Sequence, residues 1–301
     1  MAEITGIGAS VFDILMLTES FPVEDTKQKV TLSKVQGGGP CATALVAAAK
    51  LGISTAYFGV LGDDIFGRYM IEDFRRYGVE CDSVRIIKDA CSFSSVVIAN
   101  KTNSSRTCVW NPGTLPPMCE ADVPLDKLKT AKYLHLDGNH LNAAVYAAKK
   151  AREFSVKVSL DAGSCYPGIE TLLPLVDVLI PSEEFVCKFS GKGSPEDGAE
   201  WIFSRYKPEV FIVTQGDKGG FIFNGKNFSR YEPFPVKAVD TNGAGDTFHG
   251  AFLAGKAHGM ELREAVDFAS AAAAIKCCGF GARENIPSYD ETIKTIKEAE
   301  V

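Results

Sequence analysis

The sequence predicts an α/β protein with a mostly parallel central sheet. Short β-branched or apolar runs at 133–138, 156–163 and 210–216 alternate with helical patterns at 141–154 and 194–206. This alternation is typical of βαβ units, in which each helix crosses back over the sheet. The run VFIV at the start of 210–216 is continuously apolar, as expected for a strand that is covered on both faces.

The N-terminal third repeats this alternation and also contains two stretches that break it. Residues 13–36 and 92–111 show extended, alternating sequence without a long helix. We expect these two insertions to form a small accessory sheet, a lid that projects from the central sheet. The other elements predicted in this part are strands at 4–15 and 54–62 and helices at 41–52 and 65–78.

The C-terminal half completes the predicted sheet and adds helices. A strand at 176–181 is followed by a hairpin at 221–234, in which Asn224 and Gly225 supply the turn. Helical sequence then covers 251–278, and a last helix is predicted near 288–299. Because no repeat or shift in composition marks a second unit, we expect residues 1–301 to form one domain with the two lid insertions.

Composition argues against several classes of protein. The chain is 46% hydrophobic and 23% charged, which is ordinary for a globular protein and unlike a disordered or fibrous one. The net charge of −6 argues against a dominant basic surface for nucleic acid or anionic lipid. No apolar run approaches the length of a membrane span, and no basic segment precedes the first apolar stretch. We expect a cytoplasmic protein that binds neither nucleic acid nor a membrane.

The cysteines and histidines give no sign of a disulfide framework or a zinc site. Nine cysteines are an odd number without CxxC spacing, a pattern that suits reduced thiols. The four histidines never fall into an HxxxH or HExxH arrangement. We interpret His135, His140, His249 and His258 as surface or packing residues.

The stretch VDTNGAGDTFHGAF (239–252) carries the strongest chemical signal. The small residues Gly243, Ala244 and Gly245 leave backbone N–H groups free to surround an anion where a helix begins. Asp246 adds a carboxylate to the same turn. In phosphoryl transfer to a hydroxyl, such amides stabilise the migrating group, while a carboxylate orients the alcohol and accepts its proton. We predict that Asp246 is the catalytic base and that the helix start lowers its pKa.

Taken alone, GAGD also fits an ordinary helix start with a favourable first-turn acid. The longer segment DTNGAGDTFHGAF, however, resembles the C-terminal signature of the PfkB, or ribokinase-like, family of carbohydrate kinases. VQGGGPCATALVAAAKLG (35–52) followed by GVLGDDIFG (59–67) resembles the family's N-terminal signature. The resemblance covers essentially the whole chain, and the residues of these segments most resemble those of the sulfofructose kinase-like bacterial sugar kinases.

This resemblance implies a three-layer α/β/α fold with a small β-sheet lid, and ATP-dependent phosphorylation of a primary hydroxyl of a small sugar or sugar derivative. It also implies the sugar-binding residues. Three glycines match a hinge where the backbone approaches the sugar and absorbs lid movement. These glycines also fit a tight turn before the 41–52 helix, and we expect both interpretations to hold at once. The residues assigned to the substrate are Asp13, at the end of the first predicted strand, Gly37, Gly38, Gly39, Lys27, Asn111 and Asp137.

The same resemblance implies sites for ATP and for metal ions. The residues assigned to the nucleotide lie in TQGDKGG (214–220) and are Thr214, Gly216, Lys218 and Gly219. Mg²⁺ is assigned to Glu183, which fits equally well as the first turn of a helix that begins at Ser182. Potassium is expected beside the anion-binding turn, where its ligands would come from Asp240, Asn242, Gly279, Gly281 and Asn285.

Two positions depart from the family pattern. Ala42 stands where the family carries a sugar-binding asparagine, and Ser182–Phe185 replaces an Asn-x-x-Glu element. A nucleoside kinase of the same fold and a non-catalytic sugar or nucleotide sensor therefore stay open, although a sensor has no need for Asp246.

The sequence does not fix the sugar. Lys27 could bind an anionic substituent of the sugar. Asn139, however, occupies a position where an arginine would bind a sulfonate or phosphate better, through two parallel hydrogen bonds. A neutral hexose or ketose, or a sugar acid, is equally compatible. We also expect a homodimer formed through the lid, because an exposed sheet edge invites pairing.

Overall fold

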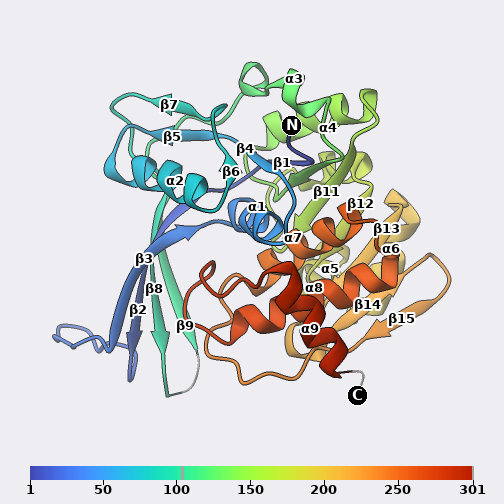
Figure 1. Cartoon of the computed structure of the whole chain (residues 1–301). Coiled ribbons are helices and arrows are strands. Elements are labelled where there is room, and N and C mark those ends of the chain that lie inside the picture. The colour runs from blue at the N-terminus through green and yellow to red at the C-terminus, as the bar shows by residue number, and fades with distance from the viewer. Residues whose placement is uncertain (103–104, 300–301) are drawn as a thin grey trace.

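The computed structural model describes residues 1–102 and 105–299, and its centre is a nine-stranded sheet (Figure 1). The strand order is β15-β14-β13-β12-β11-β10-β1-β4-β6, parallel from β13 to β6 and antiparallel for β14 and β15. The predicted mostly parallel sheet and the hairpin at its edge are therefore confirmed. The strands are β1 (Ile4–Ile7), β4 (Thr55–Phe58), β6 (Val79–Glu80), β10 (Tyr133–Leu136), β11 (Lys157–Ala162), β12 (Val178–Pro181), β13 (Val210–Thr214), β14 (Gly220–Phe223) and β15 (Phe228–Tyr231).

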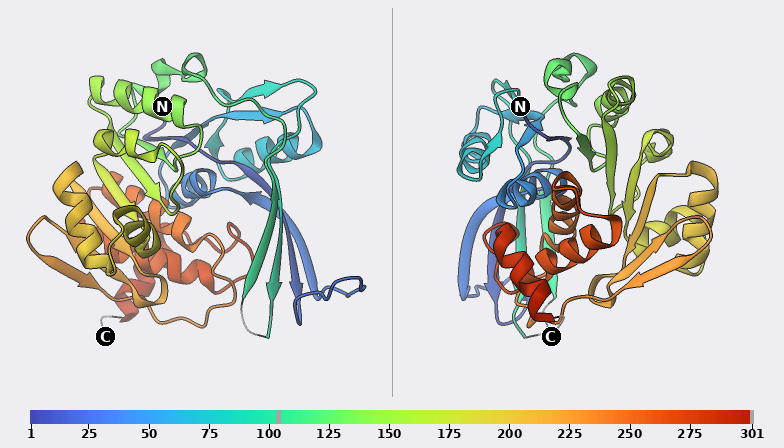
Figure 2. Two further views of the ribbon diagram at one scale, coloured as in Figure 1. Left: turned by 180° about the vertical axis from the view of Figure 1, so that it is seen from behind. Right: turned by 45° about the vertical axis from the view of Figure 1, so that its right-hand side comes forward.

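Helices cover both faces of this sheet, as Figure 2 shows. Alternate strand residues point to opposite faces, so Ile180 joins one apolar cluster and Leu179 joins the other. The first cluster includes α1 (Pro40–Lys50), α2 (Ile65–Arg76), α7 (Ala244–Ala257), α8 (Leu262–Cys277) and α9 (Tyr289–Ala299). The second includes α3 (Leu125–Leu128), α4 (Leu141–Glu153), α5 (Glu183–Ser190) and α6 (Pro195–Tyr206). Short 3₁₀ turns are η1 (Glu120–Asp122), η2 (Ile169–Thr171), η3 (Leu173–Leu175) and η4 (Gly216–Lys218).

A separate four-stranded sheet projects from this body (Figure 1). Its order is β3 (Leu32–Gly38), β2 (Val11–Thr18), β8 (Ser94–Asn100) and β9 (Arg106–Asn111). This is the small accessory sheet that the sequence predicts. A further parallel pair joins β5 (Val60–Gly62) to β7 (Arg85–Ile87).

Two predicted elements are divided in the structure. The strand expected over 4–15 is split because the chain leaves the central sheet after Ile7 and enters the accessory sheet at Val11. A Cβ at Gly8, in this bend, would lie 2.4 Å from the Cβ of Cys41. The helix expected over 251–278 is split between α7 and α8, where Gly259 has a φ of 87°.

Among the residues that the structure describes, no helix combines the length and the apolar character that crossing a bilayer requires.

Candidate active site

Asp246 lies in the first turn of α7, near the carboxyl ends of the central strands. Gly243 precedes the helix in a left-handed conformation (φ 77°), and a Cβ built on it would lie 2.8 Å from the Cβ of Ala282. Glycine avoids both the backbone strain and this contact. Besides burial, two other carboxylates raise the pKa of Asp246 through their charge. They belong to Asp161, near the end of β11, and Asp137, just after β10. The turn thus lies at the sheet edge where open α/β folds bind ligands.

One of the three backbone amides predicted for the anion is already bonded within the turn, and the two amides that follow it are available. The amide of Ala244 donates to the carbonyl of Thr241 (3.2 Å), so the expectation that it is free is wrong. Gly245 and Asp246 have no carbonyl four residues earlier within α7, because the helix begins at Ala244. A Cβ built on the exposed Gly245 meets no atom of the described residues within 4 Å. Open space therefore lies at Gly245, the residue before Asp246.

The ionisation of Asp246 differs from the prediction. Burial and the negative charge of Asp161 raise the pKa of Asp246 to about 7, and the positive charge of His249 opposes them only in part. The predicted lowering of this pKa is wrong, because the loss of hydration outweighs the helix dipole. Asp246 is partly exposed, yet it lies deep enough for burial to be the largest cause. A base whose pKa is near neutrality is well matched to proton transfer.

A buried polar cluster lies against α7, next to Asp246. The Oδ1 atom of Asp161 is 3.2 Å from Nε2 of His249, which follows Asp246 by three residues and so lies on the same side of the helix. His135 and Ser159 extend the cluster, with 3.4 Å between Nδ1 and Oγ. Burial lowers the pKa of His135 to about 3 and keeps it neutral.

Asp161 is the charged member of this cluster that the sequence does not reveal. Burial would raise the pKa of Asp161, but the charge and hydrogen bond of His249 outweigh it and the pKa is lowered. The packing interpretation of His249 is correct as to burial, since it is 4% exposed. It misses the contact with Asp161. The available signal was a histidine one turn after the predicted base.

The three hinge glycines are packed against polar groups of the protein. The contacts that a Cβ would make are 2.0 Å to Nη1 of Arg283 from Gly37, 1.9 Å to Oδ2 of Asp13 from Gly38, and 2.4 Å to the carbonyl oxygen of Ala9 from Gly39, whose φ is 91°. Glycine at these positions is required by the folded chain itself. The tight turn before α1 is present, and close packing accompanies it.

Arg283 ties this hinge to the body of the protein and was not predicted. Its side chain is 1% exposed. Nη1 donates to Oδ2 of Asp73 in α2 (2.6 Å), and Nη2 donates to the carbonyl of Gly38 (2.8 Å). Nε donates to Oγ1 of Thr43 in α1 (3.2 Å). Nothing local in the sequence marks this network, because Asp73 is 210 residues away along the chain.

Asp13 lies in the accessory sheet, not in the first strand of the central sheet. It is in β2, opposite Gln36 of β3 and therefore beside the hinge. Its Oδ1 accepts a hydrogen bond from Oγ of Ser95 (2.6 Å), and burial raises its pKa although this bond opposes the shift. Asp13 thus reaches the hinge from the projecting sheet.

Asp137 has both carboxylate oxygens bonded within the protein. Oδ2 accepts from the amides of Ala9 (2.8 Å) and Cys41 (3.1 Å). Oδ1 accepts from the amide and the side-chain Nδ2 of Asn139, at 2.9 and 3.1 Å. The two bonds at Oδ2 hold the bend after β1 against the start of α1, and the two at Oδ1 are made within the turn after β10. These four bonds leave little acceptor capacity for a sugar.

The other two predicted substrate residues lie at opposite ends of the accessory sheet. Asn111 is at the end of β9, in the row that crosses the sheet through Ser94 and Phe12 to Gly37. It is exposed, and its Oδ1 accepts from the amide of Gly113 (3.0 Å). Lys27 is exposed in the loop between β2 and β3, beyond the far end of the sheet. The structure therefore places Asn111 near the hinge and Lys27 away from it.

The predicted nucleotide segment forms the connection between β13 and β14. Thr214 ends β13, where its Oγ1 lies 3.5 Å from the carbonyl of Pro181 at the end of β12. Gly216 and Lys218 are exposed in η4. Gly219 is buried with a φ of 73°, and a Cβ on it would lie 2.2 Å from the carbonyl oxygen of Tyr231. Gly219 therefore makes the turn, while the other three lie at the end of the sheet.

Glu183 is the first residue of α5, as the alternative interpretation expected. Ser182 caps this helix by accepting from the amide of Phe185 (3.1 Å). Oε2 of Glu183 accepts from Nε2 of Gln215 (3.0 Å), in the nucleotide segment. Within 1–102 and 105–299, no group of three or more His, Cys, Asp or Glu side chains could hold a metal ion. Any Mg²⁺ in this site would depend on phosphate oxygens and water.

The residues predicted for potassium lie together, and the oxygens of Asp240 among them are bonded within the protein. Asp240 accepts from the amide of Asn242 at Oδ1 (2.8 Å) and from the amide of Gly281 at Oδ2 (2.9 Å). Its carbonyl accepts from the side chain of Lys276 (2.8 Å). The side chain of Asn285 packs onto Gly279, where a Cβ would lie 1.0 Å from Nδ2. The oxygens of Asp240 are therefore already bonded to N–H donors.

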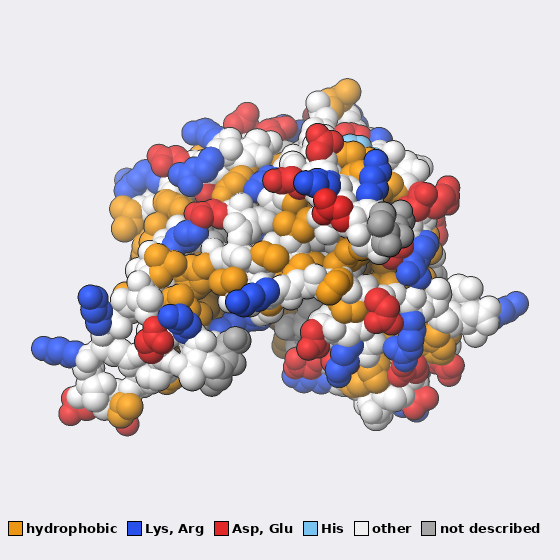
Figure 3. Space-filling model, turned by 60° about the horizontal axis from the view of Figure 1, so that its bottom comes forward, with side chains coloured by type: hydrophobic (Ala, Val, Ile, Leu, Met, Phe, Trp, Pro, Cys, Tyr) orange, Lys and Arg blue, Asp and Glu red, His pale blue; other side chains and the backbone are white. Residues whose placement is uncertain are grey.

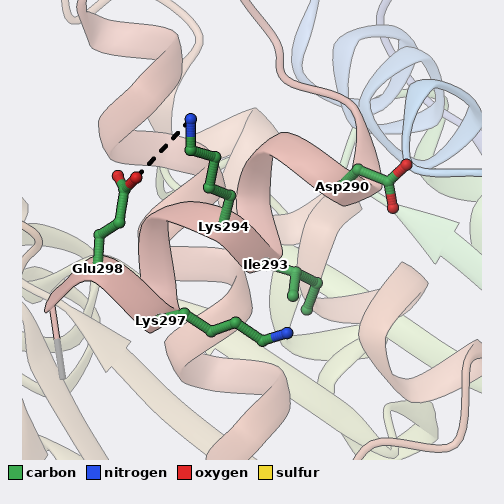
Figure 4. Close-up of a pocket in the computed structure, with 5 residues that line it drawn as sticks. All are labelled: Asp290, Ile293, Lys294, Lys297 and Glu298. Atoms are coloured by element: carbon green, nitrogen blue, oxygen red, sulfur yellow. Dashed lines mark ion pairs between the residues drawn. The ribbon is translucent and has the colours of Figure 1, made fainter. Parts of the chain in front are cut away.

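A cavity of about 400 Å³ lies between the central and accessory sheets. Its lining includes Ser10 in the bend after β1, Phe93 before β8, and Asn139 and His140 after β10. Figure 3 shows a recess between the projecting part of the molecule and the rest of the body. A second hollow of about 610 Å³ on α9 is lined by Ile293, Lys294, Glu298 and neighbours (Figure 4). Neither lining includes a residue that the sequence assigned to catalysis, substrate, nucleotide or metal.

The fold and this site together define an α/β protein with a projecting sheet and a glycine-rich turn that carries a carboxylate and available backbone amides. Residues 1–288 match the model of the pfkB family of carbohydrate kinases. The chain belongs to this family, and the resemblance seen in the sequence is confirmed.

Similar proteins agree with this assignment. A ribokinase from Haemophilus influenzae is 27% identical over 87% of this chain and 88% of its own length. A nucleoside kinase from Methanothermobacter thermautotrophicus is 23% identical over 97% of this chain and 94% of its own. The structure of Arabidopsis thaliana ribokinase complexed with ribose and ATP is 26% identical, with a TM-score of 0.85 over 98% of this chain and 99% of that one. The predicted ribokinase-like fold is therefore confirmed.

Proposed function

We propose that this protein transfers the γ-phosphoryl group of ATP, bound as its Mg²⁺ complex, to a primary hydroxyl of a small sugar or sugar derivative. The observation that carries the proposal is the first turn of α7, where a carboxylate with a pKa of about 7 stands beside two available amides and open space. The ribokinase complexed with ribose and ATP supports this choice of reactants.

In the proposed reaction Asp246, in its ionised form, accepts the proton of the sugar hydroxyl. The hydroxyl oxygen forms a bond to the γ-phosphorus as the bond from that phosphorus to the bridging oxygen breaks, and ADP leaves with that oxygen. The amides of Gly245 and Asp246 and the positive end of α7 stabilise the charge on the phosphoryl oxygens. The products are a sugar phosphate, ADP and a proton that Asp246 then releases to water.

The pKa of Asp246 favours an enzyme over a sensor that only binds its ligands. Burial of a carboxylate beside Asp161 costs stability at neutral pH, because two negative charges oppose each other. Such an arrangement is typical of a group that moves protons. A binding protein would gain from a neutral side chain at this position.

A nucleoside kinase is the second candidate, and the similarity to the M. thermautotrophicus nucleoside kinase favours it. In that case the acceptor hydroxyl belongs to the ribose of a nucleoside and Asp246 keeps the same role. The difference then lies in what the recess between the two sheets accommodates.

The test combines a ligand panel with Asp246→Asn. We expect MgATP and one or more sugars or nucleosides to raise the melting temperature of the wild type and to release ADP. In Asp246→Asn we expect turnover to fall by roughly 10²–10⁴-fold while the ligand-induced stabilisation stays. Equal turnover in the two proteins would contradict the role of Asp246. Stabilisation by ligand without any ADP release from the wild type would favour the sensor.

We further propose a cytoplasmic homodimer that forms through the accessory sheet. Its edge strands β3 and β9 carry exposed apolar side chains, with Val109 64% and Trp110 62% exposed in β9 and Val35 46% exposed in β3. Apolar side chains on an edge strand favour pairing with another sheet. In sedimentation experiments we expect Trp110→Glu to yield monomers, while Tyr166→Glu, an exposed aromatic outside this sheet, stays dimeric. A wild-type monomer at all concentrations would contradict the dimer.

A further inference from the structure

Lys276 is a buried lysine that supports the turn before Asp246. It lies in the last turn of α8 and is 0% exposed. Its Nζ donates to the carbonyl oxygen of Asp240 (2.8 Å). Burying a lysine is costly unless its charge meets compensating groups. The identity of those groups indicates what this lysine does.

The surroundings of Lys276 are negative. The carbonyl of Cys277, at the end of α8, accepts from the amides of Val239 (2.7 Å) and Asp240 (3.2 Å), so the negative end of the helix faces this segment. Burial and, to a smaller extent, the positive charge of Arg106 lower the pKa of Lys276, while the charges of Asp240 and Asp246 oppose that shift. A positive charge at this place is therefore attracted both by the segment and by the proposed catalytic base.

The ammonium of Lys276 bonds to a residue of the predicted potassium site. Asp240 is the acidic residue of that site, and Lys276 donates to its carbonyl. The amides of Asn242 and Gly281 bond its two carboxylate oxygens, so Asp240 is held at three points. Gly243 and the first turn of α7 follow directly. Fixing Asp240 in this way fixes the path of the chain into the anion-binding turn.

We propose that the Lys276 ammonium takes the place of a bound monovalent cation, so that the turn before Asp246 is held in its active geometry without potassium. Lys276 is then a positioning residue, because it acts through Asp240 and not on the reactants. The expected effect on turnover rests on the proposed kinase function, whereas the expected effect of ions on stability does not.

The first test needs only the wild-type protein. We expect its turnover to agree within about twofold in potassium, sodium and tetramethylammonium chloride at equal ionic strength, because Lys276 supplies the charge. We expect its melting temperature in potassium chloride to match that in sodium chloride. An increase in turnover of about tenfold or more with potassium over the other two ions would overturn the proposal.

The second test removes the ammonium in two ways. Lys276→Ala leaves space, and in tetramethylammonium chloride we expect its turnover to fall by about tenfold or more. Potassium, ammonium or methylammonium ions should then restore much of the turnover and raise the melting temperature by about 3 °C. Lys276→Met fills the same space without charge, so we expect its turnover to fall and these ions not to restore it.

Lys256→Ala is the matched control, since Lys256 Nζ also donates to a backbone carbonyl, that of Met260 (2.7 Å), but at the far end of α7. We expect no ion-specific rescue there. The proposal would be overturned if Lys276→Ala had the same turnover and melting temperature in all the ions, or if the ions rescued Lys276→Met as well as Lys276→Ala. Lys276 would then have a packing role only. If no substrate turns over, the melting temperatures of the wild type and of Lys276→Ala still decide it.

Discussion

The hinge turn at Gly37–Gly39 leads into α1 and the turn at Gly243–Gly245 begins α7. Both are glycine-rich, but their surroundings differ. In the hinge, a Cβ at any of the three positions would lie within 2.4 Å of another protein atom. In the second turn, Gly243 is similarly confined, whereas Gly245 faces open space. The absence of a Cβ serves packing in the first turn and leaves room for a ligand in the second.

The largest effect is expected from removing the group that packs the hinge. Arg283→Met leaves the carboxylate of Asp73 buried without its main partner, so we expect the free energy of unfolding to fall by about 3–5 kcal/mol. Chemical denaturation measures the loss. Arg76 also pairs with Asp73 (3.8 Å) but its side chain is 62% exposed, so Arg76→Met should change stability by less than about 0.5 kcal/mol. Equal losses would contradict the importance of burial.

Alanine substitutions in the two turns test the comparison directly. Gly39 has a φ of 91° and its Cβ would meet a backbone oxygen, so Gly39→Ala should cost about 2–3 kcal/mol. Gly245→Ala should keep or slightly raise stability, because alanine favours the helix. Its methyl group would fill the open space, and we expect turnover to fall by about 100-fold. Denaturation and ADP release separate the two outcomes, and full activity in Gly245→Ala would remove the case for a ligand there.

The raised pKa of Asp246 in the open turn predicts how the stability of the protein depends on pH. The pKa of Asp246 is about 7 in the folded protein, above the ordinary 3.8, so the folded form binds this proton more tightly. Stability from this group is therefore present at low pH and is lost as pH rises from about 4 to 7.

Asp246→Asn should remove this dependence. We expect the variant to exceed the wild type by on the order of 1–2 kcal/mol at pH 8, after allowance for solvent at the partly exposed carboxylate, and to match it below about pH 4. Asp197→Asn is the control, because Asp197 is exposed at the same position of α6. Melting curves across this range measure the difference, and a constant difference at every pH would contradict the raised pKa.

The smallest effects are expected from the buried cluster next to Asp246. Asp161 raises the pKa of Asp246 and His249 lowers it. Asp161→Asn should therefore move the acidic limb of the rate profile to lower pH, and His249→Gln should move it to higher pH, each by about half a unit to one unit. Rates measured from pH 5 to 9, in steps of about half a unit, report these shifts. Shifts of the same sign would contradict this account.

Local pattern was sufficient to predict the two sheets, whereas the layers of the fold and the proposed role of the turn at Gly243–Gly245 were implied by the family resemblance. Alternation of strands and helices predicted the parallel sheet, and extended sequence around 92–111 predicted the accessory sheet. The split of 4–15 was missed because β1 and β2 are both apolar, and only the packing of Gly8 against α1 shows where the chain turns. Helix boundaries near Gly259 were missed for a similar reason.

The properties of the site that were missed depend on residues distant in sequence. The pKa of Asp246 was expected to fall because only the local helix was visible, whereas Asp161 comes from β11. Arg283 and Lys276 look like ordinary surface charges until their partners are known. A lysine directly after the run AAAAI was the one local sign of a buried charge.

The bond between Arg283 and the carbonyl of Gly38 joins residues 245 positions apart. During synthesis the N-terminal segment leaves the ribosome long before its partner exists. Until then Asp73 lacks its counter-charge and the base of the projecting sheet lacks its anchor. Because Arg283 is translated late, its bond to Gly38 forms among the last events of folding. A chain that stops before residue 283 cannot form this bond.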